Sequence, residues 1–149
     1  MSTIDDKPLE SVLFFAIDRM VRRSKEWTIQ IFKEHQFPVT VDQWILLKRI
    51  GEDNGLSQRS LAETTFKDPA AVTRIIDILE KKALVQRHRH PEDRRTHQIL
   101  LTESGLELVK QMTPVVQDIR KKALGDLPAQ DLETTRRVVH RMYKNMNGQ

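Results

Sequence analysis

Residues 87–102, RHRHPEDRRTHQILLT, gather side chains that can bind anions or metal ions into one short segment. Four arginines and three histidines surround the acidic pair Glu92 and Asp93, and the segment ends in the apolar run 99–101. Because a planar guanidinium pairs well with phosphate, a basic loop of this kind is typical of polyanion binding. The apolar end indicates that the loop is anchored in a folded core.

The positive charge of the chain is concentrated near this loop. The whole sequence has a formal net charge of only +4, whereas residues 81–95 hold six lysines and arginines against two acids. Local excess charge favours a nucleic-acid contact, although a solvated charged face has the same composition. The predicted helices and strands around the loop are therefore needed to distinguish a nucleic-acid contact from a solvated charged face.

A metal site and an enzyme are the other chemistries that these residues suggest. His88 and His90 share one strand face and His97 lies across the turn, but the sequence offers no obvious fourth ligand. Glu103 and Glu107 have helical spacing without a paired base, a nucleophile or a Gly-rich phosphate loop. We therefore expect no metal, no cofactor and no enzymatic activity.

Length and composition limit the class of protein. A chain of 149 residues with 11 Gly and Pro (5 plus 6) fits one mainly helical domain, 1–149. The absence of cysteine excludes disulfides and thiolate metal sites. The polar N-terminus is unlike a signal peptide, and no apolar run is long enough to span a bilayer. We expect a cytoplasmic protein without a membrane contact.

The first half of the sequence predicts helices with well-marked starts. Apolar residues recur every three or four positions over 9–35, and a helix this long is expected to pack against a second chain. Thr40 and Gln43 form a capping box at the start of the next helix. Ser57 caps a short helix that runs to Thr65.

The second half predicts a helix, a hairpin and two further helices. Asp68 followed by Pro69 is a favourable N-cap and first position, so a helix is expected over 68–82. Extended runs at 84–90 and 96–101 flank the turn PEDRR and predict a two-stranded hairpin. The last predicted helices cover 103–124, where Pro114 should introduce a kink, and 129–146.

The helix 68–82 has one face suited to a DNA groove. A helical wheel turns Val72, Ile75, Ile76, Leu79 and Ala83 toward the core. The opposite face carries Ala70, Thr73 and Arg74, with Ala71 at its flank. Small and cationic side chains let a helix enter the major groove and reach base edges. A short helix, a tight turn and this second helix form a helix-turn-helix, a pattern that many core helix pairs share.

The hairpin provides a second surface that could contact DNA. Arg87 and Arg89 lie two residues apart on one strand and therefore share a face. Arg94 and Arg95 lie at the tip, where a guanidinium can enter the narrow minor groove. We expect Asp93 to hold an arginine by a charge-assisted pair.

The run DPAAVTRIIDILEKKALVQRHRHPEDRRTHQILLTESG resembles the signature region of the MarR family of winged helix-turn-helix transcriptional regulators. Asp93 and Arg95 match the family's D-x-R wing pattern, and Leu101 and Thr102 match the L-T that opens the next helix. The resemblance implies a mainly α fold in which a winged helix-turn-helix DNA-binding core with a small β-hairpin wing is enclosed by long N- and C-terminal dimerisation helices. The dimerisation helices would be 1–35 and 103–149, and the DNA-binding region 36–102.

The resemblance also implies a function. The chain is expected to be a homodimeric, sequence-specific regulator that binds double-stranded DNA at a pseudo-palindromic operator, with helix 68–82 in the major groove and wing 84–101 in the minor groove. Arg95 would be the minor-groove arginine, oriented by Asp93. The expected DNA-binding residues are Ser57, Arg59, Ala70, Ala71, Thr73, Arg74, Arg87, Arg89, Asp93, Arg94 and Arg95.

Two departures from the family pattern and two alternatives accompany this expectation. Ala83 replaces the usual Gly before the first wing strand, and the lack of cysteine excludes a thiol-oxidation switch.

Family members often respond to small aromatic or phenolic effectors, so a repressor released by such a ligand is expected. Five aromatic residues could line an effector pocket, although plain core packing is favoured: Phe14, Phe15, Trp27, Phe32 and Trp44. The alternative function is a winged-helix protein-interaction module that has lost DNA binding.

Overall fold

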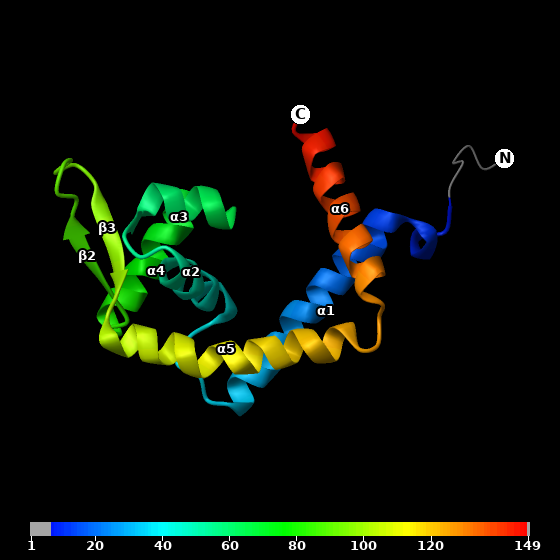
Figure 1. Cartoon of the computed structure of the whole chain (residues 1–149), viewed down its shortest axis with the longest axis horizontal. Coiled ribbons are helices and arrows are strands. Elements are labelled where there is room, and N and C mark those ends of the chain that lie inside the picture. Colours follow the sequence, from blue (N-terminus) through cyan, green and yellow to red (C-terminus); the bar gives the residue numbers. More distant parts are fainter. Residues whose placement is uncertain (1–6, 149) are drawn as a thin grey trace. The chain divides into compact units, whose positions relative to one another are not determined.

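The computed structural model describes residues 7–148, which form two compact units, the first ending at Pro114 and the second beginning at Val115. Figure 1 traces the elements along the chain. The first unit contains the 3-10 turn η1 (Leu9–Ser11), α1 (Leu13–Glu34), α2 (Val41–Glu52), β1 (Leu56–Ser57), α3 (Gln58–Thr65), α4 (Pro69–Lys81), β2 (Val85–Arg89), β3 (His97–Leu101) and the start of α5 (Glu103–Leu124). The second contains the rest of α5 and α6 (Ala129–Met146). The mainly helical fold class is confirmed.

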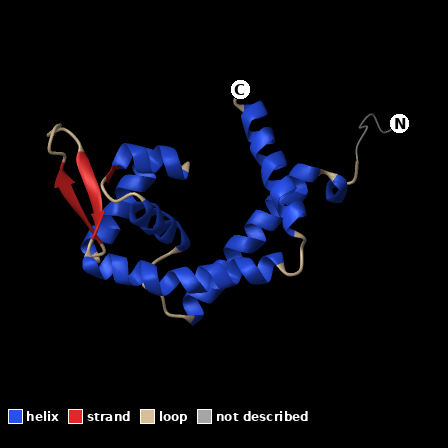
Figure 2. Cartoon of the chain, viewed as in Figure 1, coloured by secondary structure: helices blue, strands red, loops and turns tan. Residues whose placement is uncertain are grey.

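The predicted hairpin is present and belongs to a small sheet, drawn in red in Figure 2. The three strands are antiparallel in the order β1-β3-β2. Ile99 lies in the middle of the sheet, opposite Leu56 on one side and Arg87 on the other. Strand β1 was not predicted, because a two-residue strand leaves no alternating pattern in the sequence.

The helix starts follow the predicted capping chemistry. The Thr40 hydroxyl accepts from the Gln43 backbone N–H, and the Gln43 side chain accepts from the Thr40 backbone N–H, which completes the capping box. The Ser57 hydroxyl accepts from the Ser60 N–H at the start of α3. Asp68 Oδ2 accepts from the Ala71 N–H at 3.1 Å and so begins α4. Each cap satisfies a backbone donor that has no partner within its helix.

The core of the first unit lies between α2, α3, α4, the sheet and the start of α5. Its fully buried side chains are Leu46, Leu47, Ile50, Leu61, Val72, Ile76, Leu79, Val85, Ile99 and Met112. The apolar end of the wing segment is therefore anchored as expected, through Ile99. Each of these side chains contributes roughly 1.5–3 kcal/mol by leaving water.

Two of the expected core positions of α4 differ in the structure. Ile75 is only half-buried, and Ala83 is exposed because α4 ends at Lys81, two residues earlier. Ala83 has a φ of +56°, the left-handed conformation that favours glycine. Ala83 thus adopts the backbone conformation expected of the glycine that the family pattern has here. This conformation strains the backbone, because alanine disfavours a positive φ.

The wing strands are joined to α5 by a close backbone approach. Gly105, in the first turn of α5, is buried, and a Cβ built on it would lie 2.0 Å from the Leu84 carbonyl oxygen. Thr102 caps this helix, because its hydroxyl accepts from the Gly105 N–H at 3.0 Å and donates to the Ala83 carbonyl. Only glycine allows α5 to start against the strand at this distance.

The first helix is shorter than expected. Residues 9–35 do not form one helix, since the turn η1 and the extended Val12 precede α1. Several apolar side chains remain exposed on α1 and, in the second unit, on α6: Leu13, Phe14, Met20, Val21, Val138, Val139 and Met146. Among residues 7–148 no helix is long and apolar enough to cross a membrane.

Candidate nucleic-acid interface

The outward face of α4 carries the small and cationic side chains expected from the helical wheel. Ala70, Thr73 and Arg74 are exposed, and Ala71 is half-buried at the flank. The Asp68 cap and the buried Val72, Ile76 and Leu79 hold the opposite face against the core. Ala70, Ala71 and Thr73 are small and the Arg74 side chain is unbranched and flexible, so a groove could approach the helix closely.

The start of α3 lies beside this face and is linked to it by a hydrogen bond. Gln58 Nε2 donates to Thr73 Oγ1 at 3.2 Å, and the Thr73 hydroxyl donates to the Pro69 carbonyl oxygen at 3.1 Å. Ser57 is half-buried with its hydroxyl in the helix cap. Arg59 has a side chain that is 89% exposed and pairs with Glu63 at 3.1 Å. Of these residues, Arg59 is the most accessible to a polyanion.

Arg87 is held within the protein by three side chains. Its Nη2 lies 2.6 Å from Asp77 Oδ1, its Nη1 lies 2.9 Å from Glu80 Oε1, and its Nε donates to Gln58 Oε1 at 2.9 Å. Its side chain is only 19% exposed. This guanidinium therefore fastens strand β2 to α4 and to the first residue of α3.

Gln58 is a residue that the sequence did not single out. It accepts from Arg87 of the wing and donates to Thr73 of α4, so one amide connects three elements. No local signal marks such a residue, because its partners lie 15 and 29 positions away in the sequence.

The structure of the wing tip contradicts the predicted pairing of Asp93 with an arginine side chain. Asp93 was expected to hold an arginine through a charge-assisted pair, but its Oδ1 accepts instead from the backbone N–H of Arg95 at 3.0 Å. No ion pair within residues 7–148 joins the Asp93 carboxylate to the Arg95 guanidinium. A carboxylate two residues before an N–H readily closes a local turn, and this geometry competes with side-chain pairing. Asp93 therefore shapes the turn and leaves the guanidinium to solvent.

The remaining tip residues support the same turn. The backbone N–H of Thr96 donates to the Asp93 carbonyl oxygen at 3.2 Å, and the Glu92 N–H donates to His90 Nδ1 at 3.1 Å. Arg94 and Arg95 are exposed, as is Arg89 on β2. The described part of the chain holds no cluster of three or more His, Cys, Asp or Glu side chains that could bind a metal ion.

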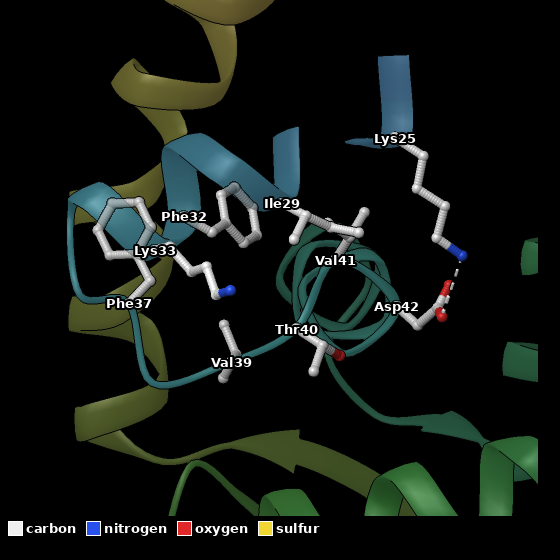
Figure 3. Close-up of a pocket in the computed structure, with 9 residues that line it drawn as sticks. All are labelled: Lys25, Ile29, Phe32, Lys33, Phe37, Val39, Thr40, Val41 and Asp42. Atoms are coloured by element: carbon white, nitrogen blue, oxygen red, sulfur yellow. Dashed lines mark ion pairs between the residues drawn. The ribbon is translucent and has the colours of Figure 1, made fainter. Parts of the chain in front are cut away.

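The aromatic residues divide between core and surface. Trp44 and Phe32 are each 4% exposed, which supports core packing, whereas Phe14 and Phe15 are 58% and 37% exposed on α1. Trp27 is half-buried. Phe32 also lines a cavity of about 320 Å³ between the end of α1 and the start of α2, which is drawn in Figure 3.

A capped helix with a small, cationic outer face beside an arginine-tipped hairpin defines the winged helix-turn-helix class of DNA-binding fold. The comparison with known families points to one branch of this class. The MarR family model matches residues 39–97, from just before α2 to the first residue of β3, so this part of the chain is similar to MarR family proteins. Similar proteins are named as transcriptional regulators, the class that the sequence predicted.

One named relative matches part of the chain. A protein of Bacillus subtilis (strain 168), named as the uncharacterized HTH-type transcriptional regulator YhbI, is 35% identical over 96 residues, which are 64% of this chain and 62% of that protein. The match thus spans less than two thirds of the relative's length.

Solved structures share the fold. The S. aureus MepR-DNA complex has a TM-score of 0.82 at 22% identity and covers 90% of this chain and 98% of its own. The PcaV transcriptional regulator from Streptomyces coelicolor, solved in complex with its natural ligand, has a TM-score of 0.78 at 18% identity, with coverages of 95% and 98%.

Proposed function

We propose that the chain is a dimeric, sequence-specific DNA-binding regulator of transcription, acting in the cytoplasm as a repressor that a small molecule releases. One observation carries the proposal: the small, cationic face of α4 lies next to a wing whose arginines extend from a strand anchored by the buried Ile99. Helix 68–82 would enter the major groove, and wing 84–101 would reach the minor groove.

Each residue of the interface has a proposed role. Ala70 and Ala71 let the helix approach the DNA, while Thr73 and Arg74 contact base edges or phosphates. Arg94 and Arg95 extend toward the minor groove from the turn that Asp93 closes. Ser57 and Arg59 contact the backbone from the start of α3.

Arg89 and Arg87 would act differently although they lie on one strand. Arg89 is exposed and in the proposal contacts phosphate. Arg87 acts on DNA binding chiefly by holding the wing against α4, since its donors are engaged by Asp77, Glu80 and Gln58. A rigid wing carries its arginines at a defined distance from the recognition helix.

Dimer formation would bury the exposed apolar side chains of α1 and α6. Leu13, Phe14 and Met20 of α1 and Val138 and Val139 of α6 are large apolar groups left in water by the single chain. A two-fold dimer presents two recognition helices to half-sites about one helical turn apart, so a pseudo-palindromic operator is expected. The DNA-bound MepR and ligand-bound PcaV have the same fold, which is consistent with DNA and a small aromatic or phenolic effector as partners.

The test compares Arg95→Ala with Lys110→Ala, an exposed cation of α5 that lies outside α4 and the wing. We expect Arg95→Ala to weaken operator binding about tenfold or more at fixed salt, because hydrogen bonds from a charged group are worth roughly 1.5–3 kcal/mol. Dimerisation, measured by analytical ultracentrifugation, should not change, and Lys110→Ala should bind like the parent. Equal operator affinity of the parent and Arg95→Ala would refute the role of the wing.

A further inference from the structure

A chain of hydrogen bonds runs from the wing to the outer face of α4. The Arg87 Nε donates to Gln58 Oε1 at 2.9 Å, and the Gln58 Nε2 donates to Thr73 Oγ1 at 3.2 Å. The Thr73 hydroxyl in turn donates to the Pro69 carbonyl oxygen at 3.1 Å, one helical turn earlier in α4. All four residues belong to the first unit. The chain of bonds therefore ends on the face of α4 that carries the expected DNA contacts.

The direction of every bond in this chain is set by Arg87. A guanidinium has five N–H donors and no acceptor, so the amide of Gln58 must turn its oxygen toward Arg87. The amide nitrogen of Gln58, which only donates, then faces the Thr73 oxygen. The Thr73 proton is left for the Pro69 carbonyl oxygen, which only accepts. Arg87 is itself held in place, because two carboxylates of α4 accept from its other two nitrogens.

The Thr73 side chain is exposed, yet its hydroxyl has no proton to offer to DNA. A base edge that only accepts hydrogen bonds, such as O6 and N7 of guanine, therefore finds no donor on this side chain. The oxygen is also held between the preceding turn of α4 and the start of α3 by its two bonds. The part of Thr73 that remains available to a groove is its γ-methyl group.

A second methyl group lies beside it. Ala70 is exposed three residues before Thr73, and side chains at this spacing are neighbours on the surface of a helix. The two residues together form a small apolar area on a face that is otherwise polar and cationic. An apolar area of this size matches a single methyl group on a base.

Thymine is the base whose major-groove edge carries such a group. Its C5-methyl is the apolar feature that the four base pairs present there, and a threonine methyl can contact it. We propose that Thr73, beside Ala70, recognises the C5-methyl group of a thymine in each operator half-site, and that Gln58 is the positioning residue that keeps the Thr73 hydroxyl turned away from the DNA. This inference rests on the proposed function and specifies the base feature that α4 reads.

The first experiment removes only the methyl group from the DNA. Each thymine of an operator enriched from a random pool of duplexes is replaced in turn by deoxyuridine, which keeps every hydrogen-bonding group of the base. Fluorescence anisotropy at fixed salt gives the thymine ratio, the affinity of the full chain for the parent operator divided by its affinity for the uracil operator. We expect a thymine ratio of about four at one position in each half-site, as for the loss of one buried methyl-sized group.

Two variants separate the methyl group of Thr73 from its hydroxyl. Thr73→Val keeps a γ-methyl group and removes the oxygen, so the thymine ratio should stay at about four, whereas Thr73→Ser removes the methyl group and should lower the ratio below about 1.5. A general loss of affinity does not affect the ratio, because the ratio compares two duplexes with the same variant. The reverse pattern, with the ratio kept by Thr73→Ser and lost by Thr73→Val, would overturn the proposal by assigning recognition to the hydroxyl.

Gln58→Glu tests the positioning role. A carboxylate only accepts hydrogen bonds, so it competes with the Pro69 carbonyl for the Thr73 proton and turns the Thr73 side chain. The thymine ratio should fall to about two or less, whereas Gln86→Glu, the same change at an exposed residue of β2, should leave it at about four. An unchanged ratio in Gln58→Glu would refute the positioning role. Thermal melting of each variant verifies that it is folded.

Thymine recognition and the proposed function can fail separately. An operator that is bound tightly but tolerates uracil at every position would overturn thymine recognition and leave DNA binding by α4 and the wing standing. An operator whose half-sites contain no thymine would have the same consequence. A chain that enriches no duplex would refute the proposed function itself, and thymine recognition with it.

Discussion

Replacing Arg87 by methionine tests how the wing is held. The substitution keeps an unbranched apolar stem while removing the guanidinium that contacts Asp77, Glu80 and Gln58. Arg89→Met is the matched control, because it makes the same change two residues along the same strand at an exposed position. Only the first substitution removes contacts between the wing and α4.

The expected magnitude follows from the exposure of the partners. The side chains of Asp77 and Glu80 are 51% and 44% exposed, so solvent screens each ion pair to roughly 0.5–1 kcal/mol. The hydrogen bond to Gln58 adds about 1 kcal/mol. Arg87→Met should therefore lower the free energy of unfolding by about 2 kcal/mol, and the exposed Arg89→Met by no more than about 0.5 kcal/mol.

Urea denaturation followed by circular dichroism measures this stability difference. Operator binding at several salt concentrations then separates the two roles. Arg89→Met should reduce the slope of log affinity against log salt by about 0.9, as expected for one lost phosphate contact, whereas Arg87→Met should weaken specific binding without changing the slope. Equal stability of the two variants, or a reduced slope in Arg87→Met, would refute the assignment of Arg87 as the residue that holds the wing.

Three further predictions concern the framework around the interface. Gly105→Ala should destabilise the fold by about 2–3 kcal/mol, because the new Cβ would meet the Leu84 carbonyl oxygen, whereas Ser104→Ala in denaturant titrations should change stability by less than about 0.5 kcal/mol. Ala83→Gly should stabilise the protein by about 0.5–1 kcal/mol, because it relieves a φ of +56°; a lower urea midpoint would contradict this reasoning. The hydrogen bond from Lys67 lowers the pKa of Asp42 in the folded state, so its ion pairs with Lys67 and Lys25 stabilise the protein above about pH 4, and that contribution is lost as the pH falls through the folded pKa. Stability measured from pH 6 to pH 2.5 should consequently fall less steeply below pH 4 in Asp42→Asn than in the parent.

The helices and the hairpin of the winged helix-turn-helix region, residues 36–102, were predictable because the sequence signals that mark them are local. A capping box at Thr40 and Gln43 and the Asp68–Pro69 start each depend on residues within one helical turn, and the structure forms the corresponding bonds. The hairpin also follows from a local pattern, two extended runs around a polar turn. Such signals survive folding because the rest of the chain does not compete for the same groups.

The contacts between elements were not predictable in the same way. Arg87 and Arg89 look alike on one strand, yet within residues 7–148 only Arg87 forms ion pairs with carboxylates, because α4 presents Asp77 and Glu80 to it. Asp93 was expected to bind a guanidinium, but a nearby backbone N–H was the more accessible donor. The distinction depends on distances that spacing in the sequence does not encode.

The cavity between α1 and α2 shows the same limit. Phe32 was named among the possible pocket residues, but no sequence pattern marks the lysines of the cavity, and Phe37 and Val39 lie in a connection rather than in a periodic element. Only the folded arrangement brings Lys33 over Phe32 and places Asp42 between Lys25 and Lys67.

Selection of bound duplexes from a random pool by the full chain is the most direct test of sequence-specific regulation by α4 and the wing. The account predicts enrichment of two inverted half-sites whose centres lie about 10 bp apart, one helical turn, and loss of this enrichment with Arg95→Ala. A pool that remains random after repeated selection, or that yields a single half-site, would contradict it.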